Sequence, residues 1–269
     1  MIRSQKSELR IKKIIPLFMA AIALFCFINS AKIASAELTA KANHDHINID
    51  FFYHGSTVSV SGITDPGTDL IIKIASPEGH EALKEKGKIG AILWMNVATM
   101  NFEHVPNLYS IHSTRKLDGM ISREEMDKYV IGYSALSRHA TIEPAANADE
   151  KEKWFSEFIR YKEKSKLYST SDGKIEMKDK NGKQSYYILT QWPYQAPPGD
   201  YIVTVYAVKD GKVVDQAESK VLVEQAGVVK TLAGMAKNNA ALYGLLSIVS
   251  ALGAGFGVGL VFRKGGGAH

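Results

Sequence analysis

The sequence predicts a mainly β protein, in which an exported β-sandwich with a helical insertion is followed by one C-terminal transmembrane α-helix. Short segments rich in Ile and Val alternate with polar residues and are separated by turn residues, which is typical of half-buried strands. Asn181-Gly182 and Asp210-Gly211 each lie between two such segments, and these dipeptides favour tight β-hairpin turns. The run 240–262 carries no charge and has the ~20 apolar residues needed to cross a bilayer.

Residues 1–36 have the layout of a secretory signal peptide. A basic region precedes the apolar stretch 14–27, and Ala34-Ser35-Ala36 is a small-x-small cleavage pattern. We expect cleavage after Ala36, and the alternative is an uncleaved N-terminal anchor. Cys26, the only cysteine, lies in this segment, so the exported part has no thiol for a disulfide or a thiolate metal site.

The strands expected in the exported domain, 37–225, fall on both sides of a helical region. Their expected ranges are 46–53, 57–63, 69–75, 89–96, 99–103, 108–113, 174–177, 185–189, 201–208 and 212–223. Pro198-Gly199-x-Tyr201 opens a late strand and resembles the corner of immunoglobulin-like sandwiches, where a Tyr hydroxyl bonds nearby backbone. We therefore expect an immunoglobulin-like β-sandwich.

Two helices are expected within the insertion, at about 120–168. Ser122-x-x-Glu125 is a capping box, and the apolar residues that follow as far as Tyr133 recur at helical spacing. The second helix begins near Asn147-x-x-Glu150 and has an aromatic face. This face is expected to pack on the sandwich, and the alternative is a groove for a partner or ligand.

The charge distribution excludes a nucleic-acid surface. The chain has a net charge of +5, but residues 1–36 carry +5 and residues 263–269 carry +2, which leaves −2 for 37–262. The basic residues therefore serve membrane topology. The positive-inside rule places Arg263 and Lys264 in the cytoplasm. We expect a bacterial inner-membrane protein with 37–225 in the periplasm, a juxtamembrane segment at 226–239, one span at 240–262 and a cytoplasmic tail at 263–269.

Three motifs carry a resemblance to a known family. They are FFYHG at 51–55, GAILWMN at 90–96 and F-x-x-V-P-x-x-Y-S-x-x-S-T-R-K-L at 102–117. With these motifs the chain resembles an uncharacterised family of alphaproteobacterial transmembrane proteins, and it departs from the family pattern at His112 and Lys116. The resemblance implies a signal peptide, an exported β-rich domain and one C-terminal span. It also implies an accessory role beside a permease, with the sulfite-exporter type as the candidate.

Two residue sets could bind a ligand. His44-Asp45-His46 offers two imidazoles to Cu(II), Ni(II) or Zn(II), although a metal site needs further ligands. The alternative is an exposed, polar start of a strand. The second set could bind a small oxyanion through its guanidinium and hydroxyl groups, and it consists of Tyr109, His112, Ser113, Thr114 and Arg115. The alternative is that the guanidinium pairs with Glu124 or Glu125.

The sequence carries no pattern for catalysis. Gly132-x-Ser134 lacks the second Gly of a nucleophile elbow, and His80-Glu81 is not followed by the second His of a zinc-protease motif. No glycine-rich phosphate loop follows a strand. We therefore expect neither an enzyme nor a cofactor, and the alternative is a hydrolase without a recognisable motif.

Small residues recur along the span at four-residue spacing, which lets another helix approach closely. The residues concerned are Ser247, Ala251, Gly253, Gly255, Gly257 and Gly259. They predict that the span pairs with itself or with a helix of a permease. The first functional hypothesis is therefore a membrane-anchored accessory or interaction subunit. The second is an exported binding module for a metal ion or a small oxyanion.

Overall fold

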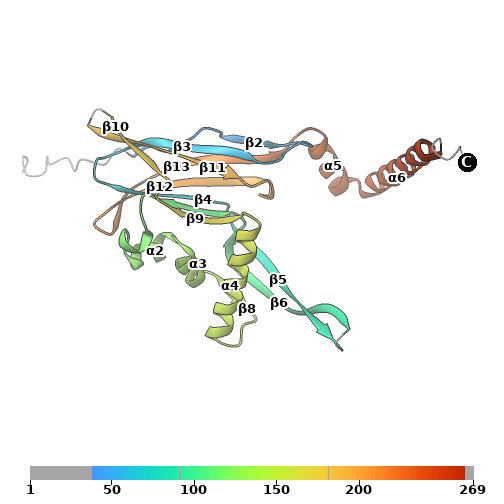
Figure 1. Ribbon diagram of the computed structural model, residues 1–269, viewed down its shortest axis with the longest axis horizontal. Helices are drawn as coiled ribbons and strands as arrows, with labels where there is room; N and C mark the ends of the chain where they lie inside the picture. The colour runs from blue at the N-terminus through green and yellow to red at the C-terminus, as the bar shows by residue number, and fades with distance from the viewer. Residues whose placement is uncertain (1–37, 91, 181, 264–269) are drawn as a thin grey trace, which may run out of the picture. The chain divides into compact units, whose positions relative to one another are not determined.

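The computed structural model describes residues 38–90, 92–180 and 182–263. The predicted signal peptide, 1–36, and residues 264–269 of the predicted tail lie outside the described residues. The described part contains two larger sheets, a smaller sheet and an apolar C-terminal helix (Figure 1). The predicted mainly β class with one C-terminal apolar helix is confirmed.

The two larger sheets take strands from both ends of the domain. The four-stranded sheet has the order β1 (Lys41–Ala42), β3 (Ser56–Thr64), β11 (Lys183–Trp192) and β10 (Glu176–Lys180). The six-stranded sheet has the order β2 (His46–Ile49), β13 (Lys212–Gln225), β12 (Gly199–Lys209), β4 (Asp69–Ala75), β7 (Tyr109–Ser113) and β9 (Tyr168–Asp172). Its edge strands β2 and β9 pair in parallel with their neighbours, whereas its inner pairs are antiparallel.

One hydrophobic core lies between these two sheets. Val58 and Val60 of β3 belong to the same buried cluster as Ile72 of β4 and Val203 and Val205 of β12. Residues two apart on a strand point to the same face, so alternate residues of each strand supply this core. The two sheets therefore pack face to face, and their assignment to the immunoglobulin-like folds stays a prediction.

A second core covers the other face of the six-stranded sheet. It is closed by α2 (Arg123–Tyr129), α3 (Tyr133–His139), α4 (Ala148–Lys164) and the small sheet β5 (Glu78–Ile89), β6 (Leu93–Pro106) and β8 (Thr141–Glu143). Figure 1 shows the helices on the side of the sheet away from β3. Because the sheet is covered on both faces, Leu70, Ile71 and Ile72 of β4 are all fully buried.

The layer on this face is larger than the helical insertion predicted at about 120–168. Strand β6 contributes Phe102 and Val105 to the second core, and β8 contributes Ile142. Strand β5 is absent from the prediction because its sequence is rich in Lys, Glu and Gly, which are poor strand formers. The predicted strands 89–96 and 99–103 are the turn end and the middle of the hairpin that β5 forms with β6.

The predicted helix after Ser122 divides into two. Ser122 caps α2, since its Oγ accepts a hydrogen bond from the Glu125 amide at 3.3 Å. The helix then ends because Val130 has a φ of 50°, and Gly132 with a φ of 85° precedes α3. Tyr109 fixes this break, because its hydroxyl donates to the Val130 carbonyl and accepts from the Gly132 amide, each at 2.8 Å.

Helix α4 begins where the sequence predicts, whereas strand β2 ends earlier than predicted. Asn147 caps α4 as expected, accepting from the Glu150 amide at 2.8 Å. Strand β2 ends at Ile49, four residues earlier than expected. The Phe52 amide donates to the Asp50 carboxylate at 2.9 Å, which closes a local turn instead of continuing the strand.

Both predicted hairpin turns are confirmed. Asp210 and Gly211 have φ values of 50° and 79°, so they connect β12 to β13 in the left-handed region that a tight turn requires. The pair Lys180 and Lys183 likewise closes the β10–β11 hairpin. The predicted corner is also present, because the Tyr201 hydroxyl donates to the Pro197 carbonyl at 2.5 Å.

Two helices follow the sandwich. Helix α5 (Gly227–Asn238) occupies the predicted juxtamembrane segment 226–239, and α6 (Ala240–Arg263) occupies the predicted span. The Ala226 amide donates to the Ile49 carbonyl at 2.9 Å, so α5 leaves the sandwich beside the end of β2.

Candidate functional site

Helix α6 is the described segment that is long and apolar enough to cross a membrane. Residues 240–260 have a mean hydropathy of 1.8, and the protein buries none of this stretch. Leu252 and Phe256 are 68% and 78% exposed. An apolar helix that the protein itself leaves uncovered is stabilised by a lipid environment, in which its backbone groups are bonded internally.

The small residues of α6 lie on two separate faces. Ala251, Gly255 and Gly259 line one shallow groove with larger neighbours such as Phe256. Residues two apart are about 200° apart around a helix axis, so Gly253 and its four-residue partner Gly257 lie on another side. A Cβ atom built on any of these four glycines would meet nothing within 4 Å. Both rows therefore leave room for a close neighbour, and the row with Ala251, Gly255 and Gly259 also forms a groove.

The predicted oxyanion set does not gather at one point. Tyr109 points into the helix-covered core, whereas His112 points to the other face of β7. Thr114 donates to the Asp69 carboxylate at 3.0 Å, and the Arg115 guanidinium binds the same carboxylate at 2.7 and 2.8 Å. The alternative, in which Arg115 pairs with Glu124 or Glu125, is also wrong. Arg115 pairs with Asp69 because β4 brings Asp69 beside the end of β7.

His112 is held in a buried hydroxyl network. Its Nδ1 lies 2.6 Å from Ser171 Oγ, and its Nε2 lies 3.0 Å from Ser110 Oγ, which contacts Ser169 at 2.6 Å. Burial, together with the charge of Lys174, lowers the pKa of His112 from 6.5 to about 4. The imidazole is therefore neutral at pH 7. Ser113 extends the row of bonds between β7 and β9 by donating to Asp172 at 3.0 Å.

The two histidines of the predicted metal site have no common ligand set. His46 Nε2 lies 2.6 Å from the Glu224 carboxylate, and this hydrogen bond, followed by the charge of Lys230, lowers the pKa of Glu224. His44 lies before β2 and is exposed. Within residues 38–90, 92–180 and 182–263, no three or more His, Cys, Asp or Glu side chains are grouped as metal ligands.

The aromatic face of α4 packs inward, as expected. Phe158 stacks on Phe102 with ring centroids 4.4 Å apart, and Trp154 and Phe155 are buried in the same core. The same face ends in Lys162, a residue that the sequence analysis missed. Lys162 follows Phe158 by four residues and therefore lies on the apolar face of the helix. This spacing could have identified it as a buried charged residue.

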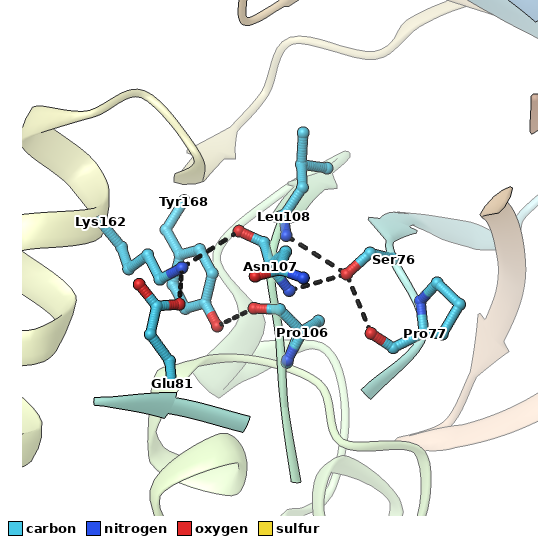
Figure 2. Close-up of polar contacts among 8 residues, drawn as sticks. All are labelled: Ser76, Pro77, Glu81, Pro106, Asn107, Leu108, Lys162 and Tyr168. Atoms are coloured by element: carbon cyan, nitrogen blue, oxygen red, sulfur yellow. Dashed lines mark hydrogen bonds and ion pairs between the residues drawn. The ribbon is translucent and has the colours of Figure 1, made fainter. Parts of the chain in front are cut away.

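The buried side chain of Lys162 anchors a polar cluster at the base of the β5–β6 hairpin (Figure 2). Its ammonium group is ion-paired with Glu81 of β5 and lies 3.4 Å from the Asn107 carbonyl. The Tyr168 hydroxyl donates to the Pro106 carbonyl at 2.6 Å. These bonds tie α4, β5, β9 and the end of β6 together.

Ser76 completes the cluster from the end of β4. Its Oγ donates to the Pro77 carbonyl at 3.0 Å and accepts from the Asn107 amide at 2.7 Å (Figure 2). Burial raises the pKa of the neighbouring Tyr168. Ser76, Pro77 and Pro106 also line a surface pocket. The bonds of the cluster hold the base of the hairpin against α4 and the end of β4.

Comparison with known families agrees with this architecture. The model of a family described as "Putative transmembrane protein (Alph_Pro_TM)" matches residues 37–264. Comparisons with curated proteins and with solved structures found no match. The matched range contains the whole sandwich, the helical layer and α6, and the chain therefore belongs to the Alph_Pro_TM family of transmembrane proteins.

Proposed function

We propose that this protein is a non-enzymatic accessory or interaction subunit of a membrane complex, with a transport complex as the first candidate. In this proposal α6 crosses the bacterial inner membrane once. The sandwich lies in the periplasm, and the C-terminus lies in the cytoplasm. Arg263 and Lys264 after the span and the export signal at 1–36 support this orientation.

The observation that carries the proposal is the groove on α6. Ala251, Gly255 and Gly259 lie in one row with no side chain to fill the space above them. In a bilayer, helices associate through such rows because their backbones can approach closely and gain van der Waals contact. A second copy of the protein or a helix of a permease would fit this groove.

The alternative function, an exported module for a metal ion or an oxyanion, has less support. Arg115 is already paired with Asp69, and His46 is already paired with Glu224. An oxyanion at Arg115 would have to displace the Asp69 carboxylate, and a metal ion at His46 would find Glu224 but, among the described residues, no group of three ligands.

The proposal is tested by isolating the native-level protein from gently solubilised membranes and identifying what accompanies it by mass spectrometry. The variant Gly255→Leu/Gly259→Leu fills the groove, and Gly253→Leu/Gly257→Leu is the matched control on another face. A permease recovered with the wild type and the control, but lost with the groove variant, would support the accessory role. Equal recovery with all three forms would contradict helix pairing through the groove.

The orientation is tested separately with reporter fusions. Alkaline phosphatase joined after Ala226 should be active, because the enzyme folds only after export. The same reporter joined after His269 should be inactive. The reverse pattern would place the sandwich in the cytoplasm and would overturn the proposed topology.

A further inference from the structure

The turn end of the β5–β6 hairpin exposes a set of large apolar side chains. We call residues 84–90 and 92–97 the hairpin tip. Its exposed apolar side chains are Ile89, Ile92, Leu93, Trp94, Met95 and Val97. Ile92 is 87% exposed and Trp94 is 63% exposed. The cross-strand pair Ile89 and Leu93 lies on one face of the hairpin together with Met95, and Trp94, which pairs with Lys88, lies on the other face. Such a patch marks a surface that is covered by something other than water.

The composition of the hairpin tip matches the interface of a bilayer. Three lysines lie within it, at 84, 86 and 88, against the single acidic residue Glu85. The Lys88 ammonium lies 5.2 Å from the centre of the Trp94 ring. Trp is enriched at the headgroup level of membranes, and Lys is attracted to anionic headgroups.

The strand register places the base of the hairpin at the end of the sheet from which the membrane helix departs. Strand β12 pairs Ile202 with Ala75, the last residue of β4, and pairs Gly199 with Val223 near the end of β13. The C-terminal ends of β4 and β13 therefore lie at the same end of the six-stranded sheet. Chain from β4 continues into β5, and chain from β13 continues through α5 into α6.

A second exposed apolar pair lies at the same end. Strand β2 runs parallel to β13 and ends beside it, and the turn that follows β2 carries Phe51 and Phe52. These two rings are 72% and 76% exposed and pack edge to face at 5.2 Å. The hairpin and the Phe51–Phe52 turn both start from the end of the sheet that leads to the span, which indicates that this end faces the membrane.

The base of the hairpin is fixed, so the hairpin holds its tip at a defined distance from this base. Lys162 and Ser76 clamp the first residues of β5 and the end of β6 (Figure 2). From Glu81 to Ile89 an extended strand covers roughly 27 Å at the usual rise per residue. The tip is therefore presented well beyond the clamp.

We propose that the hairpin tip inserts Ile92, Leu93 and Trp94 into the headgroup region of the bilayer that α6 spans, with its lysines on anionic phospholipids. This proposal rests on the proposed membrane anchoring by α6. Its consequence is a second membrane contact, which restricts the orientation of the exported domain.

The test places one nitroxide spin label at a time in the full chain, in which Cys26→Ser removes the native thiol. Labels at Ile92→Cys, Lys212→Cys and Leu252→Cys report the tip, the far end of the sandwich and the span. Each protein is placed singly in discs of phosphatidylethanolamine and phosphatidylglycerol. Collision with oxygen, which concentrates in lipid, is compared with collision with a water-soluble nickel chelate.

The expected result is an oxygen-to-nickel ratio at 92 that is several-fold above the ratio at 212. A label at 92 that matches 212, while 252 is in lipid, would overturn the tip contact and leave the anchor intact. A water-exposed label at 252 would overturn both proposals. A second preparation has two copies of the protein in each disc. If the label at 92 were shielded from the nickel chelate only in this preparation, the lipid contact would be overturned in favour of contact between copies.

The lysines are tested in the same discs. Lys84→Gln/Lys86→Gln/Lys88→Gln should lower the ratio at 92 toward the value at 212, as should discs of neutral phosphatidylcholine. If the ratio at 92 stayed the same in the lysine variant and in the phosphatidylcholine discs, the assignment of the lysines to anionic headgroups would be overturned.

Discussion

The side chain of Lys162 is 1% exposed, and its ammonium group forms an ion pair with the carboxylate of Glu81, 81 residues earlier in the chain. It also lies over the rings of Phe158 and Tyr168, at 5.5 and 5.6 Å from their centres. The pair connects α4 to β5, and it does so at the base of the hairpin whose tip we assign to the membrane surface.

Removing one partner of this pair should be costly. In Glu81→Ala the buried ammonium loses its counter-charge, so we expect the free energy of unfolding to fall by about 3 kcal/mol, at the lower end for broken buried pairs because Glu81 is partly exposed. Urea denaturation of the full chain in detergent measures this. The double variant Glu81→Leu/Lys162→Met should recover most of the loss, and equal loss in both variants would contradict a charge effect.

Stability should decrease as the pH falls below 6.5. The folded protein binds a proton at His112 with a pKa of about 4, whereas the unfolded chain binds it at 6.5. The unfolded state therefore holds more protons between these values, and the contribution of His112 is fully present above pH 6.5 and lost toward pH 4. The size is on the order of 3 kcal/mol, from about 1.4 kcal/mol per pKa unit.

The measurement is the free energy of unfolding at several pH values between 7 and 4. His112→Gln should flatten the profile in this range because it removes the titrating group. The exposed residue His44 provides the control, and His44→Gln should leave the profile unchanged. A profile that is the same in wild type and His112→Gln would show that other groups cause the pH dependence.

The tyrosine corner should contribute a single hydrogen bond. Tyr201→Phe removes the donor to the Pro197 carbonyl without changing the ring that packs edge to face on Trp192. We expect a loss of about 1 kcal/mol in the free energy of unfolding. Tyr187→Phe is the matched control, because that ring is 41% exposed, and its effect should stay within about 0.5 kcal/mol. Similar effects of both changes would argue against the corner.

The caps of α2 and α4 should each be measurable. Ser122→Ala and Asn147→Ala remove the acceptors for the Glu125 and Glu150 amides, and each should lower stability by about 1 kcal/mol. Asn147→Ser keeps an acceptor and should retain most of the stability. If it were as destabilising as Asn147→Ala, the cap would not be the cause.

The local features of this protein were predictable from its sequence. The turns at Asp210-Gly211 and Asn181-Gly182, the cap residues Ser122 and Asn147 and the apolar run at 240–262 depend on residues a few positions apart. Backbone conformation at such places is decided by side chains of the immediate neighbourhood. The family resemblance, which also rests on contiguous motifs, was confirmed by the match over 37–264.

The tertiary structure decided which groups meet across long stretches of chain. Arg115 pairs with Asp69 instead of the nearby Glu124, because β4 and β7 lie side by side. The hairpin strand β5 forms despite its polar sequence because it pairs with β6, and its base is held by Lys162.

The two faces of the six-stranded sheet show the same division. Alternation of apolar and polar residues identifies strands, but it does not say what covers each face. Sequence alone therefore determined that the chain is a β-rich protein with an apolar C-terminal helix. Only packing decided that Leu70, Ile71 and Ile72 are all buried and that the hairpin tip is left exposed, because burial depends on which distant surfaces fit together.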